Sequence, residues 1–177
     1  MAEAPGDDEA LRVVSALTGA GLTIAVAESL TGGLLGATLT DVPGSSAVVR
    51  GGFIVYATDL KSELAGVDPA LLARYGPVHP EVAVQLAAGA RTGCRADIGI
   101  GLTGVAGPGP ADGHPAGTFH VALVGPQGSG DTITLAASRQ VPGDRTEVRR
   151  AAVRTALELV EAYLERRGTP RASEAFH

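Results

Sequence analysis

The chain has 177 residues, with 14 Lys and Arg against 19 Asp and Glu, and a formal net charge of -5. With 45% hydrophobic and 19% charged residues it has the composition of a compact globular protein, and its length predicts a single domain. The acidic balance, an aromatic content of 3% and the lack of a basic run argue against a surface that binds nucleic acid or an anionic membrane. We therefore expect neither nucleic acid nor a membrane among its partners.

The ends of the chain and its cysteine content narrow the class of protein further. The start, MAEAPGDDEA, lacks the basic and apolar regions of a signal peptide, and no run approaches the ~20 apolar residues of a membrane span. We expect a cytoplasmic protein with one domain over residues 8–167, flanked by flexible residues 1–7 and 168–177. The only cysteine, Cys94, has no disulfide partner and is expected to be a small buried hydrophobe.

Helical and strand patterns alternate along the chain. Apolar residues recur every three to four positions in the predicted helices, which span residues 8–20, 31–42, 59–64, 69–75, 80–94 and 144–167. Short apolar or β-branched runs predict strands at residues 23–27, 48–57, 97–102, 118–124 and 132–140. Strand–helix units followed by a terminal hairpin predict an α/β fold, a three-layer α/β/α sandwich with a mixed β-sheet.

Residues 103–117 are rich in glycine and proline, which excludes both a helix and a central strand. Backbone amides from Gly104 to Gly117 suit a phosphate or a ribose, because glycine lets a ligand approach the main chain. A long rigid turn is the alternative, since Gly and Pro are ordinary turn residues. The overlapping GIGLTG matches G-x-G-x-x-G literally but does not open a helix, so it predicts no dinucleotide site.

Three polar residues, Ser29, Tyr56 and Lys61, lie at or just after the predicted ends of buried strands, where open α/β sheets hold their ligands. Ser29 follows the first strand directly and precedes a helix. Its hydroxyl is therefore placed to act as a nucleophile, with the amides of the next turn as oxyanion donors. A helix cap is the alternative role for Ser29.

Lys61 is the only lysine of the chain, beside 13 arginines. Unlike arginine, lysine can lose its proton inside a protein and act as a base, although a solvated surface lysine is the alternative. Working near neutrality requires its pKa to fall by about three units from ~10.4, which burial in an apolar pocket supplies. We expect Tyr56 to bridge Ser29 and Lys61 by a hydrogen bond or to stack on a ligand ring; an ordinary core aromatic is the alternative.

Histidine is the usual base for a serine nucleophile, so a Ser/His/Asp arrangement has to be weighed as well. The chain contains His79, His114, His120 and His177. The last lies in the expected tail, His120 alternates within a strand, and the other two precede prolines in loops, where capping or solvent-facing roles are common. No pattern selects one of them as the partner of Ser29.

Five ordered blocks of the sequence resemble the C-terminal domain of the competence/damage-inducible CinA family, which includes the stand-alone nicotinamide-nucleotide amidohydrolases called PncC. The blocks are AESLTGGLLGATLTDVPGSS (27–46), GGFIVYATDLKSELAGV (51–67), LTGVAGPGP (102–110), HPAGT (114–118) and GDRTEVR (143–149). The resemblance covers roughly residues 8–165 and does not include the larger N-terminal domain of full-length relatives. It therefore implies the stand-alone form of the family.

This resemblance implies hydrolysis of the carboxamide of nicotinamide mononucleotide to nicotinic acid mononucleotide and ammonia, in pyridine nucleotide salvage, without a metal or organic cofactor. It implies Ser29 as the nucleophile, Lys61 as the base and Tyr56 as the third member of the site. The implied substrate contacts are Thr31, Gly32, Gly33, Thr103, Gly104, Gly107, Gly109 and Arg145. Arg145 would bind the phosphate or a neighbouring carboxylate; a surface ion pair is its alternative role.

The chain departs from many relatives at Thr58, His79, Pro110 and His114. Each is expected at the rim of the pocket, so these departures bear on substrate preference and turnover. The alternative function is a nucleotide-binding module, associated with competence or DNA damage, that keeps the pocket with little turnover. The alanine-rich helices and the long last helix are compatible with a homodimer.

Overall fold

The computed structural model describes residues 7–128 and 130–168. The helices are α1 (Asp7–Ala20), α2 (Leu34–Thr40), η1 (Ser45–Ala47), α3 (Thr58–Glu63), α4 (Pro69–Tyr75), α5 (Pro80–Gly93) and α6 (Arg145–Gly168). The strands are β1 (Ile24–Glu28), β2 (Val49–Ile54), β3 (Ile98–Gly104), β4 (Thr118–Gly128) and β5 (Asp131–Gln140). The flexible ends predicted at residues 1–7 and 168–177 lie outside the described residues, apart from Asp7 and Gly168.

The strands form one five-stranded sheet in the order β2-β1-β3-β4-β5. Strand β1 runs parallel to both β2 and β3, whereas β4 and β5 are antiparallel additions that form the predicted hairpin. Glu28, the last residue of β1, lies between Ile54 of β2 and Leu102 of β3. The carboxyl ends of three strands therefore meet at one edge of the sheet, and the segments that leave them are neighbours.

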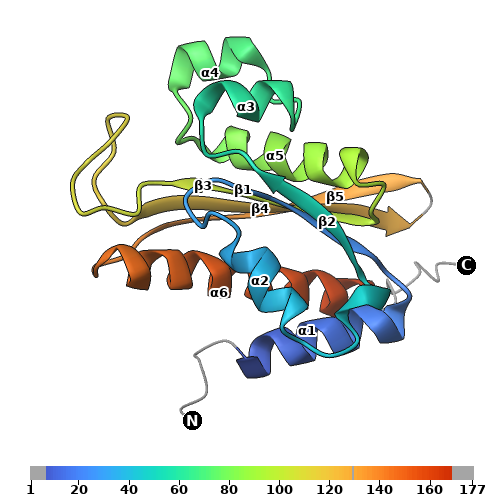
Figure 1. Cartoon of the computed structure of the whole chain (residues 1–177). Helices are drawn as coiled ribbons and strands as arrows, with labels where there is room; N and C mark the ends of the chain where they lie inside the picture. Colours follow the sequence, from blue (N-terminus) through green and yellow to red (C-terminus); the bar gives the residue numbers. More distant parts are fainter. Residues whose placement is uncertain (1–6, 129, 169–177) are drawn as a thin grey trace, which may run out of the picture.

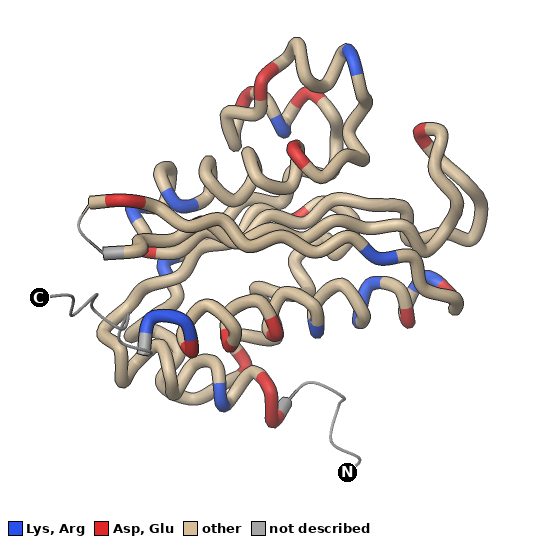
Figure 2. The backbone as a smooth tube through the Cα atoms, turned by 180° about the vertical axis from the view of Figure 1, so that it is seen from behind, with Lys and Arg blue, Asp and Glu red and all other residues tan. Residues whose placement is uncertain are grey.

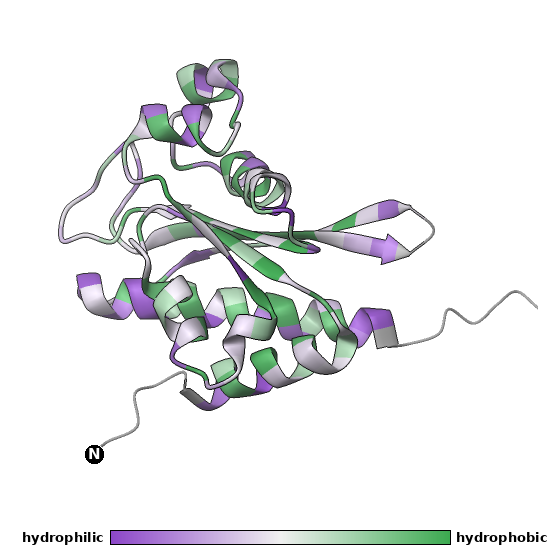
Figure 3. Ribbon diagram, turned by 45° about the vertical axis from the view of Figure 1, so that its right-hand side comes forward, coloured by the Kyte–Doolittle hydropathy of each residue, from purple (hydrophilic) through white to green (hydrophobic). Residues whose placement is uncertain are grey.

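Helices cover both faces of this sheet, so the predicted three-layer α/β/α sandwich with a mixed sheet is confirmed. Helices α3, α4 and α5 lie on one side, and α1, α2 and α6 on the other (Figure 1). Hydrophobic residues, in green, recur along the helices (Figure 3), and the buried residues of these helices are mainly apolar. Most charged residues lie on helices and loops rather than on the strands (Figure 2). On α6, Val148, Ala152, Leu157 and Val160 are buried as predicted, while Leu164 is half-buried.

Helix α5 packs directly on the backbone of β3, which explains the glycines of GIGLTG. An added Cβ at Gly99 or Gly101 would collide with the carbonyl oxygens of Ala87 and Ala83 on α5. Small residues on both elements therefore permit a close approach of helix and strand. These two glycines therefore serve the packing of α5 on β3.

Two predicted helix starts were wrong. Helix α2 begins at Leu34, after Gly33 in a left-handed conformation with φ 96°, so residues 31–33 form a turn and not the first turn of the helix. Helix α3 begins at Thr58, one residue before the predicted start at Asp59, and its N-cap Ala57 makes no side-chain hydrogen bond. In addition, Cys94 is half-buried and not fully buried. Among the described residues, no helix combines the length and the apolar character that crossing a membrane requires.

Candidate active site

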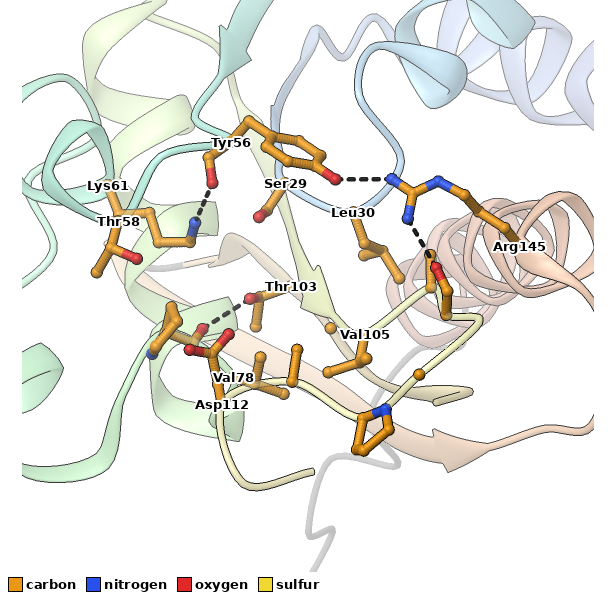
Figure 4. A pocket seen from close by; sticks show the side chains of 17 residues that line it. Ser29, Leu30, Tyr56, Thr58, Lys61, Val78, Thr103, Val105, Asp112 and Arg145 are labelled. Atoms are coloured by element: carbon orange, nitrogen blue, oxygen red, sulfur yellow. Dashed lines mark hydrogen bonds between the residues drawn. The ribbon is translucent and has the colours of Figure 1, made fainter. Parts of the chain in front are cut away.

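A cavity of about 330 Å³ lies at the edge of the sheet where β1, β2 and β3 end (Figure 4). Its walls come from the turn after β1, the start of α3, the loop before α5, the glycine- and proline-rich loop and the start of α6. The lining residues are Ser29, Leu30, Tyr56, Thr58, Lys61, Pro77, Val78, Thr103, Gly104, Val105, Ala106, Gly107, Gly109, Pro110, Ala111, Asp112 and Arg145. A volume of this size suits a small ligand, since such sites span about 300–1,000 Å³.

Ser29 stands at the floor of this cavity. Its backbone amide donates to the carbonyl oxygen of Leu102 at 3.1 Å, which ties the residue to the end of β3. The side chain points into the cavity (Figure 4), and its hydroxyl makes no hydrogen bond to any described residue. Ser29 is not a helix cap, because α2 begins only at Leu34.

Lys61 is buried, with 1% of its surface exposed, so the reading as a surface lysine is wrong. Its Nζ donates to the carbonyl oxygens of Val55 at 2.8 Å and Tyr56 at 3.3 Å. Burial lowers the pKa of Lys61 from 10.5 to about 8, against the opposing charges of Asp112 and Asp59. At pH 7 about a tenth of the amine is therefore neutral and able to accept a proton.

Ser29 and Lys61 reach the same cavity from different strands. Figure 4 shows the serine hydroxyl and the lysine Nζ pointing into one part of it. No hydrogen bond joins the two groups in this structure, since Nζ donates only to main-chain oxygens. An incoming ligand therefore meets an unbonded hydroxyl and a buried amine on adjacent walls.

Tyr56 does not bridge Ser29 and Lys61 with its side chain, contrary to expectation. Its hydroxyl accepts a hydrogen bond from Nη2 of Arg145 at 2.6 Å, and Nη1 of the same guanidinium donates to the carbonyl oxygen of Gly107 at 3.0 Å. The side chain of Tyr56 is 58% exposed, so it is not a core aromatic either. Arg145 draws the phenol towards α6, and Lys61 makes its hydrogen bond to the main-chain oxygen of Tyr56.

The end of β3 and the following loop form another wall. Thr103 and Gly104 are the last residues of β3 and not part of the loop, and the Thr103 hydroxyl donates to the carbonyl oxygen of Pro77 at 2.7 Å. This bond fixes the segment before α5 against the strand. Gly107 and Gly109 lie in the loop wall, as a ligand-binding role requires.

Three predicted substrate contacts lie outside the cavity wall. The Gly33 amide donates to Glu28, the Gly32 amide to the carbonyl oxygen of Ser29, and the Thr31 carbonyl oxygen accepts a bond of 2.6 Å from Arg149. Their amides were expected to face an anion, but the carboxylate of Glu28 already occupies the start of α2. The structure thus brings together eight of the eleven predicted site residues: Ser29, Tyr56, Lys61, Thr103, Gly104, Gly107, Gly109 and Arg145.

Glu28 is one of the residues that sequence reasoning missed. Its carboxylate, 1% exposed, accepts hydrogen bonds from the amides of Gly33, Leu35 and Gly36 at 3.0, 3.1 and 2.7 Å. A negative charge at a helix N-terminus is favourable, so Glu28 anchors α2 to the end of β1 and shapes the turn that carries Ser29. The sequence signal that could have identified Glu28 is an acidic residue at the end of an otherwise apolar strand.

Replacing Glu28 with glutamine should lower the free energy of unfolding by about 1–3 kcal/mol, because one acceptor oxygen becomes an amide group facing backbone donors. Urea unfolding measures this change. Glu63→Gln, on the exposed end of α3, is the matched control and should leave stability within about 0.5 kcal/mol. Equal stability of Glu28→Gln and wild type would contradict the anchoring role.

The histidines give no base for Ser29. His79 accepts a bond from the amide of Glu81 at 3.2 Å and stacks on Tyr75, and Nδ1 of His120 lies 2.8 Å from the hydroxyl of Ser138. None of the histidines among residues 7–128 and 130–168 lines the cavity, and His177 lies outside the described residues. Of the four positions expected at the rim of the pocket, Thr58 and Pro110 line the cavity, whereas His79 and His114 do not.

The family model of the CinA C-terminal domain matches residues 7–164. The chain belongs to this family. It is similar to a CinA-like protein of Frankia casuarinae, with 47% identity over 161 residues, which cover 90% of this chain and 36% of that protein. It is also similar to a putative competence-damage inducible protein of Desulforamulus reducens, with 38% identity over 90% of this chain and 38% of that protein.

Solved structures of CinA proteins share the whole fold. The competence/damage inducible protein CihA of Agrobacterium tumefaciens has a TM-score of 0.83 and 39% identity, over 93% of this chain and 99% of that one. A CinA superfamily protein of Klebsiella pneumoniae has a TM-score of 0.84 and 29% identity, over 92% and 99% of the two chains. By contrast, this chain spans little more than a third of the length of the curated CinA relatives quoted above.

Proposed function

We propose that this CinA-family chain hydrolyses the carboxamide of nicotinamide mononucleotide to nicotinic acid mononucleotide and ammonia. One observation carries the proposal: a buried lysine with its pKa lowered to about 8 shares a cavity with an unbonded serine hydroxyl at a strand end. A serine and a neutral amine are a nucleophile and a base for acyl transfer. The family resemblance supplies the substrate, since the cavity itself indicates only a small ligand.

The main-chain contacts of Lys61 suit a base. A neutral amine has two N–H groups and one lone pair, and the carbonyl oxygens of Val55 and Tyr56 accept two N–H bonds. The lone pair is then left for the proton of Ser29. A charged ammonium would carry a third N–H directed into the cavity. Burial disfavours this charged form and is the main cause of the lowered pKa of Lys61.

In the proposed reaction, Lys61 takes the hydroxyl proton while Oγ of Ser29 attacks the carboxamide carbon. The Leu30 amide, which makes no hydrogen bond within the described residues and follows the nucleophile on the cavity wall, is the proposed donor to the oxyanion. The protonated Lys61 gives its proton to the departing nitrogen, and ammonia leaves. Water then attacks the ester carbon while Lys61 takes one of its protons, and Lys61 returns that proton to Oγ of Ser29 as the bond between the acyl carbon and Oγ breaks. The acid product loses its remaining proton to solvent and leaves as the carboxylate.

The test is to incubate the purified chain with nicotinamide mononucleotide and to follow ammonia and nicotinic acid mononucleotide together. We expect the two products in equal amounts, and much slower release from free nicotinamide, which lacks the ribose phosphate that the loop and Arg145 would hold. Absence of both products, with the nucleotide still bound, would overturn the proposal.

The second candidate is a nucleotide-binding module with little or no turnover. It is favoured by the absence of a hydrogen bond between Ser29 and Lys61. Thr58 and Pro110 also line the cavity, and the family resemblance implies other residues at these two positions in many relatives. Binding measured by calorimetry without ammonia release would select this function.

Arg145→Lys should raise the KM for nicotinamide mononucleotide roughly tenfold and lower kcat less than about threefold. Lysine cannot reproduce the two simultaneous hydrogen bonds to the Tyr56 hydroxyl and the Gly107 carbonyl oxygen. It also cannot make a bidentate contact to phosphate. Steady-state kinetics separate the two constants. Arg150→Lys, on an exposed position of the same helix, is the control and should change neither.

A further inference from the structure

The tip of the glycine- and proline-rich loop is a tight two-residue turn. Ala111 and His114 exchange backbone hydrogen bonds of 3.0 and 2.9 Å, and Asp112 and Gly113 between them have φ of 51° and 78°. Positive φ at both central residues defines the turn type for which Asp-Gly and Asn-Gly are the preferred pairs. The position of Asp112 is therefore dictated by local turn chemistry.

This turn places a carboxylate in the cavity. Asp112 lines the wall together with Lys61 and Ser29, and Figure 4 shows its side chain directed inwards. Within the described residues, the carboxylate makes no hydrogen bond and no ion pair, although its charge acts on Lys61. The guanidinium of Arg145 lies at the opposite side of the cavity in the same view. When Lys61 is neutral, as the proposed reaction requires, the cavity has a negative wall near the reacting groups and a positive wall away from them.

Such a distribution of charge fits a ligand with the opposite arrangement. In nicotinamide mononucleotide the carboxamide is attached directly to a positively charged pyridinium ring, while the phosphate lies at the far end of the ribose. Attack by Ser29 therefore brings the cationic ring to the side of Asp112 and leaves the phosphate for Arg145. Asp112 is exposed, but unlike charges about 4 Å apart attract by more than thermal energy even in water-like surroundings.

We propose that Asp112 is a specificity-determining residue that selects amides on a cationic pyridinium ring over the same amides on a neutral ring. This inference rests on the proposed function for the identity of the substrate. It assigns the recognition of ring charge to a residue outside the set that the sequence predicted. While Lys61 still carries its proton, Asp112 also offsets the repulsion between the ammonium and a cationic ring.

The test uses a conservative variant and a neutral-ring ligand. Asp112→Asn removes the charge but keeps an oxygen acceptor and an Asn-Gly turn, so the loop should retain its shape. Binding is measured by calorimetry in Ser29→Ala protein, so that no turnover interferes. The ligands are nicotinamide mononucleotide and its 1,4-dihydro form, whose ring is neutral.

We expect Asp112→Asn to weaken binding of the pyridinium nucleotide about tenfold and of the dihydro nucleotide less than about twofold. Asp59→Asn is the matched control, because Asp59 also acts on the charge of Lys61 but does not line the cavity. It should change neither affinity by more than about twofold. An equal loss for both ligands would instead indicate a hydrogen bond to the ribose or a role in loop shape.

Equal loss, no loss, or no binding of either nucleotide would overturn the proposal. Its failure is distinguishable from failure of the proposed function, because binding is measured without the Ser29 hydroxyl. If wild-type protein released no ammonia but preferred the cationic ring through Asp112, the charge selectivity would stand and the hydrolysis would not.

Discussion

Replacing Ser29 with alanine should lower ammonia release from nicotinamide mononucleotide by about 1,000-fold or more, because a covalent pathway loses its nucleophile. The residual rate would come from water activated in the same cavity. A coupled ammonia assay, run at saturating nucleotide, measures the change. Ser15→Ala, on the exposed side of α1, is the control and should retain the wild-type rate.

The Ser29→Ala protein should remain folded and bind the nucleotide. Its hydroxyl makes no hydrogen bond to a described residue, so removing it leaves no partner unsatisfied. Urea unfolding should place its stability within about 1 kcal/mol of wild type. A variant that is stable and binds, yet releases ammonia at the wild-type rate, would contradict the assignment of Ser29.

Replacing Lys61 with arginine should also lower the rate by about 1,000-fold, since general-base groups contribute about 100- to 10,000-fold. Arginine keeps the positive charge but does not become neutral, so it cannot take the serine proton. Lys61→Met removes the charge and the base together and is expected to be equally slow. Activity retained in Lys61→Arg would exclude the amine as the base.

The pH dependence of the wild-type protein follows from the same group. With the pKa of Lys61 lowered to about 8, chiefly by burial, the neutral amine grows as pH rises. The value of kcat/KM should therefore rise about tenfold per pH unit below pH ~8 and level off above it, because this constant reports the free enzyme. A profile that is flat between pH 6 and pH 9, roughly one unit or more on each side of this pKa, would contradict a lysine base.

Much of the fold follows from local patterns in the sequence. Short apolar or β-branched runs located the five strands, and apolar periodicity located the long helix α6. The predicted starts of α4 and α5, at Pro69 and Pro80, are confirmed as well. The start of α2 did not follow, because it depends on Glu28 accepting amides from residues five to eight positions later. Strand order could not be predicted either, since pairing depends on contacts distant in sequence.

The candidate site was predictable where a residue sits next to a strand end. Ser29 was found because it is a reactive side chain that follows a buried strand. Lys61 was found because it is the only lysine in a chain with 13 arginines. The direction of Tyr56 was not predictable, as it depends on Arg145 from a helix that begins 89 residues later. Asp112 was missed for a similar reason: its turn is recognisable, but the cavity that it faces exists only after folding.

The most direct test of a serine acyl-enzyme is to trap it with the methyl ester of nicotinic acid mononucleotide. An ester acylates faster than an amide, so hydrolysis of the acyl-enzyme should become rate-limiting and the intermediate should accumulate. After an acid quench, mass spectrometry should find the nicotinate mononucleotide acyl group on the peptide that contains Ser29, and none in Ser29→Ala. An acyl group on Lys61 or another residue, or steady turnover of the ester with unmodified Ser29, would contradict the account.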